Sequence, residues 1–215
     1  DSAYVAKVLN PRKCFIEGDL TLAAHPDDTS SLTEGNYRGI EMFYTRNSNM
    51  KLSVKNCRRK ASTFWNCYAP TLDIKVENTI YDGSGYGINV NNATCNGLFR
   101  GYVAGARHAT STGGAPAYTG ISWNNTFEVK AYSGGQSGTF DSHAPTGSVI
   151  FNNCESIMGE YYLGNVNLNP QPAFVIAAKY NTIKNCKAAG THEFFASLRF
   201  IEIDNPVDII NYFFF

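Results

Sequence analysis

Short strand-like phrases, in which apolar and polar residues alternate, recur along this chain and end in Asn or Asn-Cys. Five clear copies lie at residues 52–57, 74–78, 149–154, 183–186 and 201–205, and weaker copies lie at 97–101 and 127–131. Anchored on one apolar residue each, they return every 20 to 32 residues, at Val54, Val76, Leu98, Val129, Phe151, Ile183 and Ile203. A strand this short cannot bury its apolar face alone. The repeat therefore predicts an all-β protein, a parallel β-helix (solenoid) that forms a single elongated domain.

The residues that close the phrases favour the same interpretation. Asn side chains at equivalent positions of a stack can hydrogen-bond from turn to turn, and a Cys beside them acts as a small buried hydrophobe. None of the six cysteines forms a Cys-x-x-Cys pair, so we expect free thiols and no zinc site. Free thiols indicate folding in a reducing cytoplasm, even for a protein that later acts outside the cell.

The domain organisation follows from where the phrases begin. Residues 1–50 are less regular and are interpreted as the entry turns of the β-helix, and residues 51–215 as its main body. Longer excursions are expected near 105–125 and 156–180, where extra residues could build a site on the rigid stack. The chain begins without Met and ends in the apolar run 212–215, so we expect a fragment of a longer protein. It shows no signal peptide and no apolar run long enough for membrane insertion.

Composition narrows the range of partners. Lys and Arg number 18, as do Asp and Glu, so no electrostatic attraction to nucleic acid or anionic lipid is predicted. The chain is instead rich in Tyr (13), Phe (14) and Asn. Aromatic rings and amides suit sugars, whose C–H faces lie on rings and whose hydroxyls bond to amides.

Two segments carry the candidate catalytic chemistry, residues 105–114 and 138–147. Arg107, His108, Asp141 and His143 follow their anchors at similar distances, so a stack would bring them onto one face of neighbouring turns. A His beside an Asp titrates near neutral pH and can transfer protons. Asp141 with His143 or His108 is therefore the candidate acid–base set, and Arg107 is the candidate partner of an anionic group.

The same offsets predict substrate-binding residues along the stack. They are Tyr86, Trp65, Tyr162 and Glu193. Spaced by the distance between stacked strands, about 4.8 Å, such a line of side chains resembles a groove for an extended polymer.

The reaction type stays open at this stage. Glycoside hydrolysis requires a second carboxyl beside Asp141, for which Glu155, Glu128 or Glu193 are candidates. In β-elimination of a uronic acid, Arg107 would neutralise the sugar carboxylate while His108 or His143 removes a proton. Structural alternatives are an Arg107–Asp141 ion pair or a turn cap at His143. Asp141, His143 and His108 could also hold a metal, although neither a metal nor another cofactor is expected, and no nucleophile elbow surrounds Ser142.

Three motifs carry a resemblance to a known family. They are Arg107-His108-Ala109 followed by Thr, Ser and Gly, Asp141-Ser142-His143 followed by residues 149–154, and residues 85–90. Over roughly residues 35–205 the chain resembles the pectate-lyase-like β-helix proteins of bacteriophage tails, the tailspikes and depolymerase-type tail fibres. The resemblance implies a right-handed β-helix, usually a homotrimer in the virion tail, that binds and often cleaves capsular polysaccharide or lipopolysaccharide at the host surface. Catalytic residues differ widely within this group.

Three hypotheses follow. The first is an enzyme that depolymerises a bacterial surface polysaccharide by hydrolysis or β-elimination. The second is a module that binds the glycan, or extends the tail, without cleaving anything. The third is an assembly domain that contacts other phage tail proteins.

Overall fold

The computed structural model describes residues 4–9, 15–21, 38–55, 57, 60–77, 85–113, 120–132, 139–143, 146–157, 172–189, 193–198, 207–210 and 213–214. Every helix or strand assigned within these ranges is a β-strand. In this part of the chain no helix is long and apolar enough to cross a membrane.

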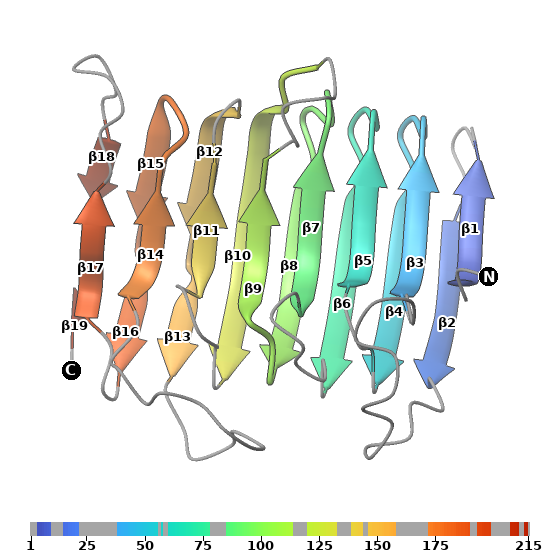
Figure 1. The fold of residues 1–215 in the computed structure, drawn as a ribbon, viewed down its shortest axis with the longest axis horizontal. Coiled ribbons are helices and arrows are strands. Elements are labelled where there is room, and N and C mark those ends of the chain that lie inside the picture. The colour runs from blue at the N-terminus through green and yellow to red at the C-terminus, as the bar shows by residue number, and fades with distance from the viewer. Residues whose placement is uncertain are drawn as a thin grey trace, which may run out of the picture.

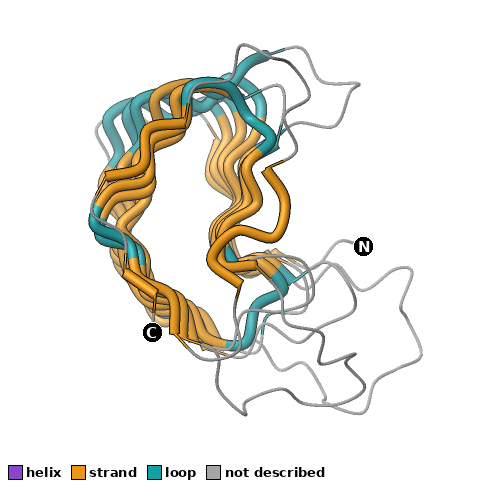
Figure 2. Tube along the Cα trace, turned by 90° about the vertical axis from the view of Figure 1, so that its left-hand side faces the viewer, coloured by secondary structure: helices purple, strands orange, loops and turns teal. Residues whose placement is uncertain are grey.

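The strands form two parallel sheets, and the chain passes from one to the other in turn (Figures 1 and 2). One sheet, called sheet A here, contains, in order, β1 (Tyr4–Leu9), β3 (Arg38–Phe43), β5 (Lys60–Trp65), β7 (Tyr86–Asn91), β9 (His108–Thr112), β11 (Phe140–Ser142), β14 (Pro172–Ile176) and β17 (Glu193–Leu198). Sheet B contains β2 (Phe15–Thr21), β4 (Asn49–Lys55), β6 (Thr71–Glu77), β8 (Leu98–Ala104), β10 (Trp123–Tyr132), β12 (Gly147–Asn152), β15 (Asn181–Lys184) and β18 (Val207–Ile210), bordered by β13 (Glu155–Ile157), β16 (Lys187–Ala189) and β19 (Phe213–Phe214). This arrangement confirms the predicted all-β class and parallel pairing.

The register of sheet B confirms some anchors and corrects others. Val54 pairs with Val76, and Phe151 pairs with Ile183, as predicted. Val76, however, pairs with Val103 instead of Leu98.

Two further anchors also need revision. Phe151 pairs with Phe127 instead of Val129. Ile203 lies outside the described residues, and Ile209 is the partner of Ile183. The error at Leu98 arises in β8, where Gly101 adopts φ +138° and replaces the middle apolar residue of the alternation. A Cβ at this position would lie 1.8 Å from the carbonyl oxygen of Ile74, so only glycine fits.

A ladder of phenylalanines fills the space between the sheets. The rings of Phe99 and Phe127 stack at 5.2 Å, and those of Phe127 and Phe151 stack at 5.6 Å. From sheet A, Phe64 meets Phe99 at 5.0 Å and Phe174 meets Phe151 at 5.5 Å. These rings are fully buried and contribute much of the apolar surface that stabilises the stack.

Asparagines serve the corners between strands. Among the described asparagines, seven have a positive φ, a conformation that Asn tolerates better than most residues: Asn47, Asn66, Asn92, Asn96, Asn124, Asn153 and Asn185. At one corner Asn124 Nδ2 donates to Asn96 Oδ1 at 2.8 Å and joins the amides of neighbouring turns, although neither asparagine ends a repeat phrase. The phrase-ending Asn56, Asn78 and Asn205 lie outside the described residues.

The described cysteines are free, as predicted. Cys57, Cys67, Cys154 and Cys186 are buried, and Cys95 is half-buried. Sγ of Cys154 donates to the carbonyl of Phe127, and Sγ of Cys186 donates to the carbonyl of Phe151 one turn later. Burial raises the pKa of the Cys154 thiol well above its ordinary value, so this group is a neutral part of the core.

The predicted excursions contain strands. The first, near 105–125, includes β9, and the second, near 156–180, includes β14; both belong to sheet A. The prediction was wrong because the confirmed anchors all lie in sheet B, so the intervening strands of sheet A were assigned to loops.

Candidate functional site

The outer face of sheet A carries a row of buried polar side chains, one from each of five neighbouring strands. In register, these are Glu41, Thr63, Asn89, Ser111 and Asp141. They alternate along their strands with the core residues, and therefore point away from the core. Each is 5% exposed or less. We call this row the polar column.

A β-bulge brings His108 onto the same face as the polar column. The backbone N–H groups of Ala109 and Thr110 both donate to the carbonyl of Thr139, at 2.8 and 3.3 Å. Two residues of β9 thus face one residue of the next turn, which shifts the alternation by one position. His108 and Ser111 are three residues apart and would face opposite ways on a regular strand, yet both approach Asp141.

The Asp141 cluster joins side chains from two neighbouring turns. His143 Nε2 lies 2.6 Å from Asp141 Oδ2, and His108 Nε2 lies 3.9 Å from the same oxygen. The Ser111 hydroxyl donates to it at 3.2 Å. The other carboxylate oxygen, Oδ1, is buried without a hydrogen-bond partner. Asp141 therefore retains one acceptor for an additional donor.

The two imidazoles differ in exposure and in charge. The side chain of His143 is 56% exposed, against 4% for His108 and 1% for Asp141. The hydrogen bond to Asp141 raises the pKa of His143 above its ordinary value of 6.5, although burial and the Arg107 charge act in the opposite direction. His143 is thus the proton donor that a ligand can reach.

Tyr86 and Lys60 extend the site across the neighbouring strands, because both lie in register with His108. Tyr86 pairs with His108 in the ladder, and their rings stack at 5.3 Å. Lys60 pairs with Tyr86 from the other side. Its Nζ lies 5.4 Å from the Tyr86 ring centre and donates to Asn89 Oδ1 at 3.0 Å. Burial raises the pKa of Tyr86, so its hydroxyl stays protonated.

Of the predicted site residues, the structure brings together His108, Asp141, His143 and Tyr86. Arg107 is half-buried, and its charge opposes the rise in the pKa of both His143 and Tyr86, so it belongs to the same electrostatic neighbourhood.

The other predicted residues are placed differently. Trp65 is not in register with Tyr86: it pairs with Asn91, at the other end of the strand. Lys60 Nζ nevertheless lies 5.8 Å from the centre of the Trp65 ring. Glu193 begins β17 and its backbone pairs with Pro172; its side chain is outside the described part of the structure. Tyr162 also lies outside the described residues.

Two of the residues considered as a second carboxyl beside Asp141 lie on sheet B instead of sheet A. Glu128 lies on β10 of sheet B, where Arg100 Nε and Asn152 Nδ2 bind it. Glu155 lies on β13 and forms an ion pair of 3.8 Å with Lys130. Neither contributes to the Asp141 cluster. Among the described residues, moreover, no three His, Cys, Asp or Glu side chains are arranged to hold a metal ion.

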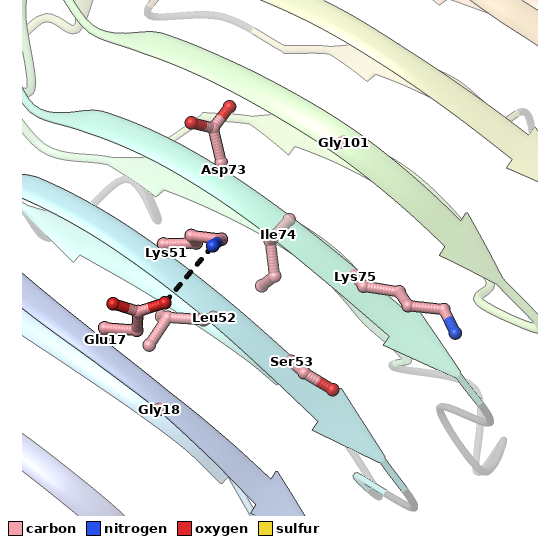
Figure 3. Close-up of a pocket in the computed structure, with 9 residues that line it drawn as sticks. All are labelled: Glu17, Gly18, Lys51, Leu52, Ser53, Asp73, Ile74, Lys75 and Gly101. Atoms are coloured by element: carbon pink, nitrogen blue, oxygen red, sulfur yellow. Dashed lines mark hydrogen bonds and ion pairs between the residues drawn. The ribbon is translucent and has the colours of Figure 1, made fainter.

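A separate hollow on sheet B does not contain the cluster (Figure 3). It is lined by strands β2, β4, β6 and β8, with Glu17 and Lys51 joined by an ion pair of 3.2 Å and Asp73 on the next strand. It contains no His and no buried ionisable side chain, so it offers no acid–base pair comparable to that on sheet A.

The sequence interpretation missed Lys60, Asn89 and Ser111. A second repeat could have revealed the last two. Four strands of sheet A, β3, β5, β7 and β9, have Gly or Ala two positions before their member of the polar column, as in Gly87 before Asn89 and Ala109 before Ser111. The small residue is required because it faces the core: a Cβ at Gly87 would lie 2.6 Å from Val103.

Comparisons with known proteins add no family assignment. The sequence matches no protein-family model and no curated protein.

Proposed function

We propose that this chain is a right-handed parallel β-helix domain of a phage tail protein, which binds a bacterial surface polysaccharide along the outer face of sheet A and cleaves it. The alternation of the chain between two parallel sheets supports the solenoid. The motif resemblance supports the right hand, the homotrimer in the virion tail, its contacts with other tail proteins and its folding in the host cytoplasm.

The proposal that the protein is an enzyme rests on the Asp141 cluster. One carboxylate holds a reachable imidazole at 2.6 Å and has a second imidazole 3.9 Å away. Two proton-transfer groups with one carboxylate fit β-elimination of a uronic acid better than a hydrolysis that needs two carboxyls.

The proposed elimination assigns one role to each group. His108 removes the proton next to the uronate carboxylate, whose charge Arg107 balances. The electron pair of that C–H bond forms the new C=C bond, and the neighbouring C–O bond of the glycosidic link breaks. His143 gives its proton to the departing oxygen. Asp141 acts as a positioning residue, because it fixes His143 and keeps it protonated.

A panel of capsular polysaccharides and lipopolysaccharide O-chains, with and without uronic acids, tests this proposal. We expect the ultraviolet absorbance of unsaturated sugar to rise with a uronic acid polymer. His143→Ala should abolish the rise, whereas Asp141→Asn should lower the rate and move its pH optimum to lower pH. Tyr102→Ala, on the outer face of sheet B, is the control. New reducing ends without that absorbance would overturn elimination in favour of hydrolysis.

Burial favours a second candidate function, glycan binding without cleavage. With only 4% of its side chain exposed, His108 leaves a substrate little access to the proposed base. Co-sedimentation with a polysaccharide whose chain length and viscosity stay constant would support this candidate and exclude the enzyme.

A further inference from the structure

Three exposed aromatic side chains lie along the corner that leads from sheet A to sheet B. Tyr68 is 51% exposed, Trp123 is 44% and Tyr180 is 51%. Parallel bridges connect Tyr68 to Cys95 and Cys95 to Trp123, so Tyr68 and Trp123 lie two turns apart along one edge of the stack. We call these three side chains the corner patch.

Gly147 determines how Trp123 lies in the corner patch. A Cβ at Gly147 would be 2.2 Å from Cζ3 of Trp123 and 2.6 Å from its Cε3. Because glycine has no side chain, the indole ring can lie across this turn. It reaches the ring of Tyr180 on the following turn, at 5.9 Å and an angle of 59°. The two rings thus form a shared apolar surface that any other residue at 147 would disturb.

Side-chain amides flank these rings. Asn124 follows Trp123 directly, and its Nδ2 donates to Asn96 Oδ1 at 2.8 Å. Both asparagines are exposed, so each amide has further hydrogen-bonding capacity toward solvent. Rings for C–H faces beside amides for hydroxyls are the groups that a pyranose requires.

We propose that the corner patch is a second saccharide-binding site, for pyranose residues that present a flat C–H face. This inference deepens the proposed function, because it gives the same polymer a contact outside the Asp141 cluster. The two surfaces are close: β11 ends at Ser142 and β12 begins at Gly147, and the N–H of Thr146 donates to the carbonyl of His143 at 3.0 Å. A chain that passes His143 can therefore continue over Trp123.

The two tryptophans of the chain allow each surface to be observed separately. Trp65→Phe leaves Trp123 as the only indole, and Trp123→Phe leaves Trp65, which is half-buried at the end of β5 in sheet A. Each variant is titrated with cellohexaose, maltohexaose and hexagalacturonate while tryptophan emission is recorded. We expect a saturable shift of the Trp123 emission to shorter wavelength with at least one hexasaccharide.

Calorimetry with the same hexasaccharide measures the contribution of the patch. Trp123→Ala should weaken binding about tenfold, the effect of losing one aromatic contact. Gly147→Ala should weaken binding as well, because it displaces the ring without removing it. Tyr102→Ala, an exposed tyrosine of sheet B, should leave the affinity unchanged.

Each outcome decides the proposal. No saturable Trp123 response with any of the three hexasaccharides, or unchanged affinity in Trp123→Ala, would overturn it. Self-association that Trp123→Ala abolishes, without a saccharide response, would identify the patch as a contact between copies of the chain. A Trp123 response without cleavage would refute only the enzymatic proposal, and cleavage with a Trp65 response alone would refute only the corner patch.

Discussion

The outer faces of the two sheets differ in how exposed their polar side chains are and in how these side chains pair. On sheet B many outward residues are charged and at least partly exposed, and they pair across strands, as Lys51 does with Glu17 at 68% and 56% exposure. On sheet A the outward residues of the polar column are buried, and on β9 and β11 they converge with two histidines on the Asp141 carboxylate. Exposed pairs contribute little to stability but keep a surface soluble. Buried polar groups are costly unless they are hydrogen-bonded, and those hydrogen bonds hold side chains in the fixed geometry that a binding or catalytic site requires.

The largest expected effect concerns the core that both sheets share. Phe127→Ala removes a fully buried ring between Phe99 and Phe151. We expect a loss of about 3–5 kcal/mol in the free energy of unfolding, because the cavity cannot be filled by its neighbours. Urea denaturation measures it. A loss below about 1 kcal/mol would show that the ring ladder does not hold the sheets together.

The next effect separates the two faces. Asp141→Ala should cost about 2–3 kcal/mol, because it removes charge-assisted hydrogen bonds and leaves buried donors unpaired. Glu128→Ala, which removes a half-buried carboxylate whose partner Arg100 is exposed on sheet B, should cost about 1 kcal/mol or less. Denaturation of both variants under identical conditions provides the comparison. Equal costs would contradict the contrast between the two faces.

A smaller effect is the pH dependence that His143 imposes. Its pKa is raised in the folded protein, so its stabilising contribution is fully present below the unfolded pKa of about 6.5 and is lost as pH rises through the folded value. The difference in unfolding free energy between the natural chain and His143→Gln should therefore be larger at about pH 5.5 than at about pH 9. A difference that grows with pH would contradict the Asp141 contact.

The smallest effect is expected on sheet B. Lys51→Met breaks an ion pair whose two side chains are mostly exposed. Because solvent and salt screen such pairs, the free energy of unfolding should change by less than about 0.5 kcal/mol. Thermal unfolding at low and high salt measures this change. A larger loss that disappears at high salt would indicate that sheet B relies on its surface charges.

The same contrast explains how far the sequence could be interpreted. Sheet B shows a clear alternation, as in Leu52, Val54, Ile74 and Val76, and this pattern predicted the stack of parallel strands. Sheet A shows no such alternation, because the residues on both faces of a strand such as β9 are small or polar and are all buried. Strands β9 and β14 were therefore taken for loops.

The sequence identified several residues of the site but not how they are arranged. Counting from the anchors placed His108 near Asp141, although one of those anchors, Leu98, was out of register. The bulge at Ala109 and Thr110 brings His108 and Ser111 to the same carboxylate, and no local sequence signal specifies it. Trp65 was misplaced along its strand because equal offsets ignored the lengths of the connections: Lys60 follows Val54 by six residues, whereas its partner Tyr86 follows Val76 by ten.

The account depends most on the contact between Asp141 and His143. Proton NMR titration of the His143 imidazole measures it directly, with Asp141→Asn as the comparison. We predict a pKa above the ordinary 6.5 in the natural chain and a lower pKa in the variant. A His143 pKa at or below 6.5 that Asp141→Asn leaves unchanged would contradict the cluster and the function proposed for it.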